Sequence, residues 1–523
     1  MIKIQSASHK HLKMPWKKAI TVGRAYDLLR NDLLEHLEIL QTQIGYEYIR
    51  FHAIFHDDMN VYKEDAKGNP IYQWHQVDKI LDSTLKLGLR HIIELNPMPA
   101  ALASGSQTIF TYKMNCTPPK SYEKWEALVR AFVLHLCERY GCDEISKWYF
   151  ETWNEPDLPF WSGSREEYYK LYAHSSKAVK SVNSKFRTGG PATSKGAWVA
   201  EFIEHCHVAA IPLDFISTHQ YPQDEYCLYQ DIKDSPFQPG MFFIDSVKKV
   251  AEIVKQSPLP HLPVIYTEWN TQSGKTGRKV TWTDNEFVDN LYAAAMLCHI
   301  CAELDDTVDC LAWWTASDIF EEIAMPAAPF SSGYGLLTMR GIPKASCNAF
   351  KLLAKMNGRL MPVEFTGSKP ACAGIIACCD SNCIRLLIWN HCPNEQNEKT
   401  VWRDKIDVLI PDAIAKNADL QGISAKIAEH HGSAYETWRQ MGSPLNLTKT
   451  QEQLLEYAGF MEYKSVSIRN NPESNTAELE FELNPNEVML VEIFPAGPSS
   501  EKLPEGIDEE LWNRQMSAMS KKQ

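Results

Sequence analysis

Short apolar runs and helical repeats alternate along the first two thirds of the chain. From Ala19 to Met356, runs of strand length are followed by segments whose apolar residues recur every three or four positions, the spacing of one helix face. The leucines of Asp27–Gln43 show this spacing, and Gly45 separates that predicted helix from a strand at Tyr46–His52. Eight such units follow one another. This alternation predicts the α/β class and a parallel sheet, which eight units close most simply as a (β/α)8 TIM barrel.

The barrel prediction assigns a range to each strand and helix. The predicted strands are Ala19–Arg24, Tyr46–His52, Leu89–Asn96, Trp148–Phe150, Arg187–Thr193, Leu213–Tyr221, Leu262–Asn270 and Cys310–Ser317. The predicted helices are Asp27–Gln43, His75–Leu87, Ser121–Tyr140, Arg165–Asn183, Trp198–Ala209, Phe243–Lys255, Asn285–Leu304 and Cys347–Met356. Because chemistry in this fold lies at the C-terminal ends of the strands, polar residues at those ends are the candidates for a functional site.

The pattern of hydrophobic residues changes after Gly358. Short, often alternating apolar segments with turn residues between them predict an appended β-sandwich over residues 358–496. Its predicted strands are Ala373–Cys379, Cys383–His391, Lys405–Ile410, Ser465–Ile468, Ala477–Leu483 and Glu487–Phe494. The barrel is expected over residues 19–357 and a C-terminal tail over 497–523. Residues 1–18 form a lead in which one predicted strand, Ile2–Gln5, could join the sandwich.

Two predicted strands end in a glutamate with aromatic neighbours. The stretch Trp148–Trp161 (WYFETWNEPDLPFW) carries Glu155, and Pro156 is expected to stop the strand because it has no N–H for a ladder. The stretch Leu262–Asn270 (LPVIYTEWN) carries Glu268. Burial raises the pKa of a glutamate, which suits a proton donor near neutral pH. Two such carboxyl groups are what glycoside hydrolysis requires.

Each glutamate also has a simpler interpretation. A single glutamate after a strand, such as Glu155, is often a surface carboxylate, and Glu268 could form a structural ion pair with Arg50. The preceding Asn154 favours a site, because an amide there can donate to a sugar 2-hydroxyl group. An arginine near a nucleophilic carboxylate also keeps it ionised, so Arg50 fits both interpretations.

Other polar side chains fall at neighbouring strand ends. His219 and Tyr221 lie on the predicted strand between the two glutamates, and Tyr221 could hydrogen-bond Glu268 and orient it. His219 and His52 could instead be core histidines satisfied by the backbone. The sequence contains no compact metal-binding motif and no glycine-rich phosphate cradle, so we expect neither a metal nor an organic cofactor.

Composition narrows the choice of partner and location. The 15 tryptophans suit stacking on sugar faces, although large cores also contain tryptophan, and the net charge of −13 argues against nucleic acid and membranes as partners. The first 20 residues contain no apolar run of signal-peptide length, and no segment approaches the length of a membrane span. The 14 cysteines show no disulfide framework. We therefore expect a cytoplasmic protein.

Nine stretches of the chain share their pattern with one known family. They are Gly45–His52 (GYEYIRFH), Asp57–Tyr62 (DDMNVY), Asn96–Gly105 (NPMPAALASG), Trp148–Asp157 (WYFETWNEPD), Leu213–Pro222 (LDFISTHQYP), Tyr266–Asn270 (YTEWN), Trp314–Glu322 (WTASDIFEE), Gly335–Lys344 (GLLTMRGIPK) and Tyr435–Pro444 (YETWRQMGSP). With these motifs the chain resembles glycoside hydrolase family 39, and within it the bacterial β-xylosidase branch. The resemblance extends from about residue 20 to residue 496.

The resemblance implies a retaining mechanism on a (β/α)8 barrel with a β-sandwich. By motif, Glu155 takes the place of the acid/base and Glu268 that of the nucleophile. The positions that match the family's sugar pocket are His52, Asn154, His219, Tyr221, Trp313, Glu321 and Glu322. Where family members commonly carry phenylalanine before the Ser-Asp pair, this chain has Ala316, so that wall of the pocket is expected to differ.

The implied substrate is a short β-1,4-xylo-oligosaccharide from which xylose is released at the non-reducing end. The alternatives are a related exo-glycosidase of the α-L-iduronidase or β-glucosidase type and a non-catalytic sugar-binding barrel. The acidic pair Glu321-Glu322 disfavours an iduronide, because a uronic acid requires a cationic clamp. Members of the family often assemble, so the sandwich and tail are candidate surfaces for a homo-oligomer.

Overall fold

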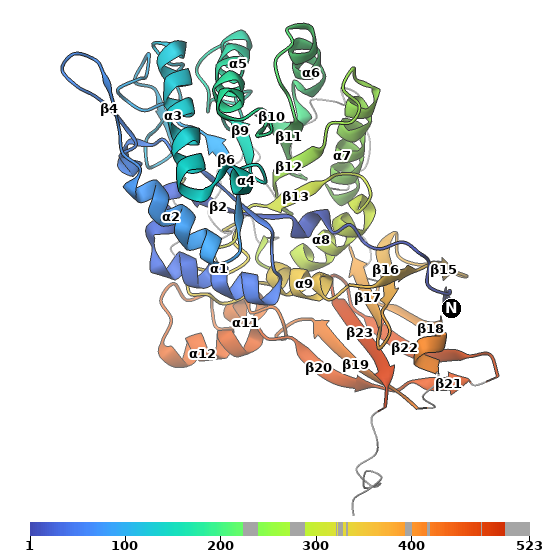
Figure 1. Cartoon of the computed structure of the whole chain (residues 1–523). Coiled ribbons are helices and arrows are strands. Elements are labelled where there is room, and N and C mark those ends of the chain that lie inside the picture. Colours follow the sequence, from blue (N-terminus) through green and yellow to red (C-terminus); the bar gives the residue numbers. More distant parts are fainter. Residues whose placement is uncertain are drawn as a thin grey trace, which may run out of the picture.

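The computed structural model describes residues 1–222, 239–271, 288–320, 322, 328–330, 333–392, 400–415, 419–471 and 473–496. Two bodies make up these residues: a barrel ringed by helices and a pair of packed sheets beside it (Figure 1). The N-terminus lies with the sheets, whereas the next residues enter the barrel.

Within the described residues, eight parallel strands close the barrel, so the predicted fold class is confirmed. In their order around the barrel, the strands are β2 (Ala19–Arg24), β3 (Tyr48–His52), β6 (Arg90–Leu95), β9 (Tyr149–Thr152), β10 (Arg187–Thr193), β11 (Phe215–Gln220), β12 (Val264–Trp269) and β13 (Cys310–Trp313). Nearly all of their residues are buried, because the interior is filled by side chains and the exterior is covered by helices.

Helices follow the strands and cover the outside of the barrel (Figure 1). They are α1 (Asn31–Gln43), α2 (His75–Lys86), α3 (Tyr122–Tyr140), α5 (Arg165–Val182), α6 (Val199–Val208), α7 (Pro239–Gln256), α8 (Leu291–Leu304) and α9 (Ala345–Ala354). Ser121 caps α3 as predicted, because its side chain accepts a hydrogen bond from the Lys124 N–H.

The predicted start of the first helix is wrong. The 3-10 helix η2 (Ala25–Leu29) precedes α1, and Arg30 between them is extended, with φ −84° and ψ 133°. Asp27 is buried and lies 3.5 Å from the Arg24 Nε, and its carbonyl accepts from the Arg30 N–H at 3.0 Å, so an ion pair and a 3-10 hydrogen bond hold the segment. The leucine spacing is the same before and after Arg30, so it does not reveal that η2 ends and α1 begins there.

The barrel also contains several short helices and hairpins. They are the hairpins β4 (Tyr62–Glu64) with β5 (Pro70–Tyr72) and β7 (Thr108–Ile109) with β8 (Met114–Asn115), the helix α4 (Cys142–Ile145), and the 3-10 helices η1 (Pro15–Lys17), η3 (Asp57–Met59) and η4 (Ser194–Gly196). At the junction of α3 and α4, a disulfide joins Cys137 and Cys142. The cysteine spacing led us to expect no disulfide, and this prediction is wrong for Cys137 and Cys142.

The appended body is a β-sandwich, as predicted. One sheet has the order β15 (Val363–Phe365), β1 (Ile2–Ile4), β18 (Trp402–Leu409), β22 (Thr476–Leu483) and β21 (Arg469–Asn471). The other has the order β14 (Arg359–Met361), β16 (Cys372–Cys379), β17 (Ile384–His391), β23 (Val488–Pro495), β19 (Leu420–Ile427) and β20 (Glu462–Val466). The helices α10 (Asp412–Ala415), α11 (Tyr435–Gln440) and α12 (Lys449–Ala458) complete it.

Three strands of the sandwich were missed, and one was misplaced. The missed strands are β14, β15 and β19, of which β19 (LQGISAKI) mixes polar and apolar residues. The single predicted strand Ser465–Ile468 is replaced by β20 and β21, which belong to different sheets. The first strand, β1, pairs with β15 and β18, so the first residues of the chain belong to the sandwich.

The second sheet is buried on both faces, which fixes the sandwich against the barrel. In β16, Ile375 and Ala377 belong to the core between the two sheets, whereas Ile376 and Cys378 belong to the main core of the barrel. This double burial explains the nearly unbroken apolar run of β16, because successive residues of a strand point to opposite faces. The barrel helices nearest to this sheet are α8 and α9.

A buried triad fixes the chain that follows β13. The Lys344 Nζ lies 2.6 Å from an Asp289 carboxylate oxygen and 2.9 Å from an Asp318 carboxylate oxygen. Burial raises the pKa of Asp318 to about 6, although the Lys344 charge opposes this shift. The triad ties the residues after β13 to the starts of α8 and α9. It thereby anchors the segment that reaches Glu322.

Among the described residues, no helix combines the length and apolar character needed to cross a bilayer.

Candidate active site

The structure brings most of the predicted site residues together at the C-terminal ends of the barrel strands. Arg50 and His52 lie on β3, Asn154 and Glu155 follow β9, His219 lies on β11, Tyr221 follows β11, and Glu268 lies on β12. All of these side chains are buried, but Glu155 and Glu268 keep exposed fractions of 8 % and 5 %. Two carboxyl groups at one strand edge, almost but not fully enclosed, can meet a small ligand.

Backbone strain marks the segment that carries Glu155. Strand β9 ends at Thr152, three residues before Glu155, so Pro156 does not terminate the strand as predicted. Trp153 and Glu155 then adopt left-handed φ angles of 69° and 43°, each of which costs roughly 1–3 kcal/mol in a residue other than glycine. The Glu155 N–H donates to the Ala192 carbonyl at 2.8 Å, which helps to hold this conformation. Strain of this kind is typical of functional sites.

Ser194, which directly follows the neighbouring strand β10, holds the same segment in place. Its N–H and its hydroxyl group donate to the two carboxylate oxygens of Asp157, at 2.9 and 2.6 Å. Trp153 is fixed as well, since its indole N–H donates to the Phe160 carbonyl at 3.0 Å. The direction in which Glu155 points is therefore set by several hydrogen bonds.

Glu268 is held in its ionised form. Arg50 Nη1 donates to its Oε1 at 2.8 Å, and the Tyr221 hydroxyl donates to its Oε2 at 3.0 Å, so both contacts expected from the sequence are present. Burial opposes ionisation, but the positive charges of Arg50 and His52 and the hydrogen bond from Arg50 favour it, and the pKa of Glu268 is lowered. A carboxylate that stays charged in a buried site is suited to act as a nucleophile.

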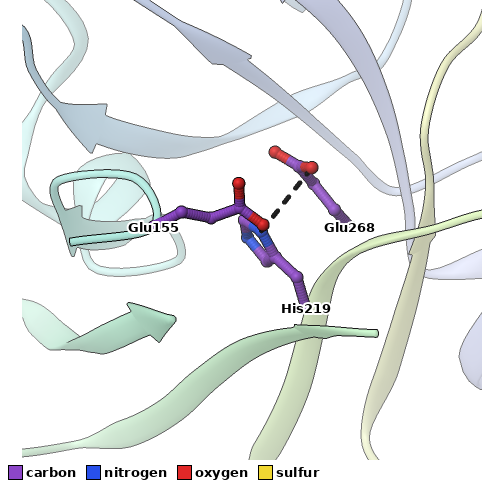
Figure 2. Close-up of side chains that lie close together, drawn as sticks. All are labelled: Glu155, His219 and Glu268. Atoms are coloured by element: carbon purple, nitrogen blue, oxygen red, sulfur yellow. Dashed lines mark hydrogen bonds and ion pairs between the residues drawn. The ribbon is translucent and has the colours of Figure 1, made fainter. Parts of the chain in front are cut away.

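The two glutamates face each other across a short gap, with His219 between them (Figure 2). One carboxylate oxygen of each and a His219 ring nitrogen all lie within 4.8 Å of one another. Retaining glycosidases place their two carboxyl groups about 5–5.5 Å apart, whereas inverting enzymes leave about 6.5–9.5 Å for a water molecule. The observed gap fits attack by one carboxylate while the other transfers a proton.

The same three atoms could also bind a metal ion, since each offers one ligand within the same small volume. Two features disfavour this interpretation. Both oxygens of Glu268 already accept hydrogen bonds, from Arg50 and from Tyr221. The positive charge of Arg50 also repels a cation at this position. The expectation of a metal-free site stays a prediction.

Two buried carboxylates that the sequence analysis missed hold Arg50 in place. Arg50 Nη2 lies 2.5 Å from Glu94 Oε2, and Arg50 Nε donates to Glu151 Oε2 at 2.6 Å. Arg50 Nη2 also donates to the Asn154 Oδ1 at 2.9 Å, so the amide NH₂ of Asn154 remains as its donor. Glu94 and Glu151 each interrupt an apolar strand (HIIEL and YFET), and a lone charge in such a run signals a buried ion pair.

His52 carries a positive charge beside the nucleophile candidate. Its Nδ1 lies 2.8 Å from Glu94, and its Nε2 lies 3.4 Å from both Glu268 and Glu322. Burial opposes the charge, but these carboxylates raise the pKa of His52 to about 10. Burial also raises the pKa of Glu322, although His52 opposes this shift. Glu322 therefore reaches the site as predicted, whereas Glu321 lies outside the described residues.

The predicted pocket position of Trp313 is wrong. Trp313 packs against Trp269 and against Phe350 of α9, with ring centroids 5.0 and 5.3 Å away, and belongs to the core outside the barrel. Successive residues of a strand point to opposite faces, so the next residue, Trp314, faces the site instead. Its ring lies 4.6 Å from the His52 ring.

Trp314 belongs to a small aromatic cluster at the site. The cluster consists of Tyr221, Trp314 and Phe320, with Tyr334 packed against it. Ala316, where the family resemblance leads us to expect phenylalanine, is fully buried in the main core. Apart from Tyr221, the aromatic wall of this site is therefore built from residues that the sequence analysis did not name as pocket residues.

Comparison with known proteins identifies the family. The sequence model of glycosyl hydrolases family 39 matches residues 1–470. The chain belongs to glycosyl hydrolase family 39. A β-xylosidase of Caldicellulosiruptor saccharolyticus is 36 % identical over 490 residues, which cover 91 % of this chain and 95 % of that protein. A β-xylosidase of Geobacillus stearothermophilus is 33 % identical over 94 % of this chain and 95 % of its own.

Solved structures agree with this assignment. A family 39 β-xylosidase from Caulobacter crescentus superposes with a TM-score of 0.79 at 29 % identity, covering 94 % of this chain and 99 % of that one. A bacterial orthologue of human α-L-iduronidase superposes with a TM-score of 0.71 at 17 % identity over 95 % of this chain and 84 % of its own, a likeness that shows the fold alone. The chain is a glycoside hydrolase of family 39.

The hydrogen bond from Tyr221 to Glu268 makes a testable contribution to glycosidase activity. Replacing Tyr221 by phenylalanine removes a donor to the ionised carboxylate and should raise the pKa of Glu268. A nucleophile must be ionised, so we expect the acidic limb of the kcat/KM profile to move to higher pH by up to about one unit. Tyr172→Phe is the control, because its buried hydroxyl donates to the Pro212 carbonyl. Equal profiles for the two variants would contradict this role.

Proposed function

We propose that the chain is a retaining exo-β-xylosidase that releases xylose from the non-reducing end of short β-1,4-xylo-oligosaccharides. The observation that carries the proposal is that one carboxylate oxygen of Glu155 lies within 4.8 Å of one of Glu268, which is kept ionised by its neighbours. The two β-xylosidases that are 33 % and 36 % identical over most of this chain support xylose as the sugar.

In the first step, the Glu268 carboxylate attacks the anomeric carbon while Glu155 donates its proton to the leaving oxygen. The bond from the anomeric carbon to the leaving oxygen breaks, an ester to Glu268 forms, and the shortened sugar departs with a hydroxyl group. Arg50 orients the nucleophile through Nη1, and the Asn154 NH₂ is the candidate donor to the sugar 2-hydroxyl group.

In the second step, the ionised Glu155 takes a proton from water, and the resulting hydroxide attacks the anomeric carbon of the ester. The bond to Glu268 breaks, so that Glu268 is again a carboxylate and Glu155 is again protonated. Two inversions at the same carbon give xylose with the starting β configuration. No step in this sequence uses a metal or an organic cofactor.

The site's charges favour a neutral sugar over a uronic acid. Within the described residues, the cations nearest to Glu268 are Arg50 and His52, and both are paired with buried carboxylates. A uronate needs a cation that can form a clamp with it, and Glu322 beside His52 would repel its charge. A β-glucosidase is the remaining alternative within the family. The presence of both glutamates at the required separation disfavours a barrel that only binds sugar.

The setting that we propose for the enzyme is the cytoplasm. Apart from the Cys137–Cys142 disulfide, the cysteines among the described residues are free and mostly buried, which favours a reducing compartment. A cytoplasmic enzyme suits short imported oligosaccharides, and the net charge of −13 favours neutral sugars over nucleic acid as partners. The exposed side chains of the sandwich, such as Tyr457 and Phe460, are candidates for contacts between copies of the chain.

Removing the acid/base carboxyl group tests the assignment of Glu155. In Glu155→Ala, we expect kcat/KM for xylobiose to fall by about 10²–10⁴, because its poor leaving group needs a proton. 2,4-Dinitrophenyl β-xyloside should still form the ester, and added azide should restore turnover and give β-xylosyl azide. Glu38→Ala, at an exposed position of α1, serves as the control. The assignment fails if Glu155→Ala hydrolyses xylobiose at the normal rate or gives no azide product.

A panel of aryl glycosides tests the sugar. We expect the β-xyloside to have the highest kcat/KM among the xyloside, α-L-arabinoside, β-glucoside and α-L-iduronide, at least about tenfold above the iduronide, because about 1.4 kcal/mol of charge repulsion is sufficient for that factor. Initial rates at one pH provide the comparison. A preference for the iduronide would overturn the proposed substrate, and calorimetric binding of xylobiose without hydrolysis would indicate a sugar-binding protein.

A further inference from the structure

We propose that Thr267 and Glu151 act as positioning residues that fix the tautomer of His219, so that His219 holds the proton on Glu155. The inference rests on the proposed function, in which Glu155 is the general acid. It concerns how that acid stays protonated in the resting enzyme. The four side chains form one chain of contacts: Glu151, Thr267, His219 and Glu155.

Glu151 determines which group donates in each of these hydrogen bonds. Its Oε2 accepts from Arg50 Nε at 2.6 Å, and its Oε1 lies 2.7 Å from the Thr267 hydroxyl group. A carboxylate paired with a guanidinium has no hydrogen to give, so the Thr267 hydroxyl must be the donor. Its single hydrogen is then committed to Glu151. The Thr267 oxygen can therefore only accept from the His219 Nε2, which lies 3.2 Å away, and Nε2 carries a hydrogen.

Arg50 offers His219 Nε2 only a longer, competing contact. Arg50 Nη2 lies 3.5 Å from this nitrogen, but an Nη2 group has only two hydrogens. One of those hydrogens is donated to the Asn154 Oδ1 at 2.9 Å, and Nη2 also forms an ion pair with Glu94 Oε2 at 2.5 Å. The 3.5 Å contact to Arg50 is longer than the 3.2 Å contact to Thr267, whose oxygen would face a second lone pair if Nε2 accepted, so the geometry favours the Nε2–H tautomer.

In a neutral imidazole with a hydrogen on Nε2, the other nitrogen is an acceptor. His219 Nδ1 lies 3.0 Å from Glu155 Oε1 and 3.5 Å from Glu268 Oε2. Glu268 is ionised and has no hydrogen to give. The hydrogen between Nδ1 and Oε1 consequently belongs to Glu155, which is the state that a general acid needs before it acts.

The alternative is a positively charged His219 beside an ionised Glu155. Burial lowers the pKa of His219 and the Arg50 charge adds to this effect, although Glu268, Glu151 and Glu94 oppose it. The charged and titratable groups that face His219 are Arg50 from β3, Glu94 from β6, Glu151 from β9, Glu155 and Asp157 from the segment after β9, and Glu268 from β12. The neutral ring agrees with the directions of the hydrogen bonds.

The same arrangement helps the second step. Once Glu155 has given its proton to the leaving oxygen, its carboxylate faces the lone pair of Nδ1 rather than a donor. This repulsion makes the carboxylate a stronger base toward water. One fixed tautomer therefore favours both the proton transfer to the leaving group and the later uptake of a proton.

Thr267→Val tests the inference, because it removes the hydroxyl group and keeps the shape of the side chain. His219 would lose its Nε2 acceptor and could carry the hydrogen on Nδ1, where it would stabilise an ionised Glu155. We expect the alkaline limb of the kcat/KM profile to move about one unit to lower pH, because the acid then loses its proton earlier. For xylobiose at neutral pH, kcat/KM should fall about tenfold or more, whereas 2,4-dinitrophenyl β-xyloside, which needs no acid, should lose less than about threefold.

Thr267→Ser keeps the hydroxyl group and should restore both the profile and the xylobiose rate. Thr84→Val is the matched control, because Thr84 is also buried and its hydroxyl lies 2.8 Å from the Nε2 of another buried histidine, His91. It should leave the pH profile unchanged. Thermal unfolding identifies variants that are not folded, and Thr267→Ala replaces Thr267→Val if the latter does not fold.

Equal losses on the two substrates, or an unmoved alkaline limb in the folded hydroxyl-free variant, would overturn the inference and show that Thr267 is merely structural. Wild-type hydrolysis of both xylosides is measured first. A wild-type protein that cleaves neither would overturn the proposed function together with this inference. Normal wild-type cleavage with an unchanged Thr267→Val profile would overturn this inference alone.

Discussion

A single buried guanidinium holds the site together. Arg50 is fully buried and reaches Glu94, Glu151 and Glu268, three carboxylates that come from three different barrel strands. Removing one member would leave the others as uncompensated buried charges, which typically costs about 3–5 kcal/mol. His52 supplies a second positive charge, so the cluster of two cations and three carboxylates is already net negative. A further negative charge at Glu155 would be disfavoured there, which supports the different roles that we propose for Glu155 and Glu268.

The barrel makes this cluster possible because it delivers side chains from distant parts of the sequence to one edge. Arg50 and Glu268 are separated by 218 residues, yet their side chains lie 2.8 Å apart. The strained turn after β9 aims Glu155 at this cluster, and the Lys344 triad fixes the segment that brings Glu322 to it. The sandwich contributes indirectly, since its doubly buried sheet packs against the helices α8 and α9, at whose N-terminal ends the triad lies.

Much of this could be predicted from the sequence, because the strongest signals are local. The alternation of strand and helix patterns predicted the barrel, and Glu155 and Glu268 were found because each follows an apolar run. It was harder to predict which side chains of a strand face the site. Trp313 and Trp314 are adjacent, and only the pleat of the strand end decides which of them faces the site. Glu94 and Glu151 escaped notice since their partner Arg50 lies far away in the chain. The strand β19 depends on pairing with the distant strands β20 and β23. The helix start at Asn31 and the disulfide are local features that the leucine and cysteine spacings do not reveal.

The central claim is that Glu268 forms a covalent bond with the sugar, while Glu155 first donates a proton and later accepts one. The most direct measurement is to inactivate the protein with 2,4-dinitrophenyl 2-deoxy-2-fluoro-β-xyloside, which slows the breakdown of the ester, and to locate the label by peptide mass spectrometry. The account predicts one fluoro-xylosyl group per chain, attached to Glu268 and released when a sugar acceptor is added. A label on another residue, or turnover with no covalent species, would contradict it.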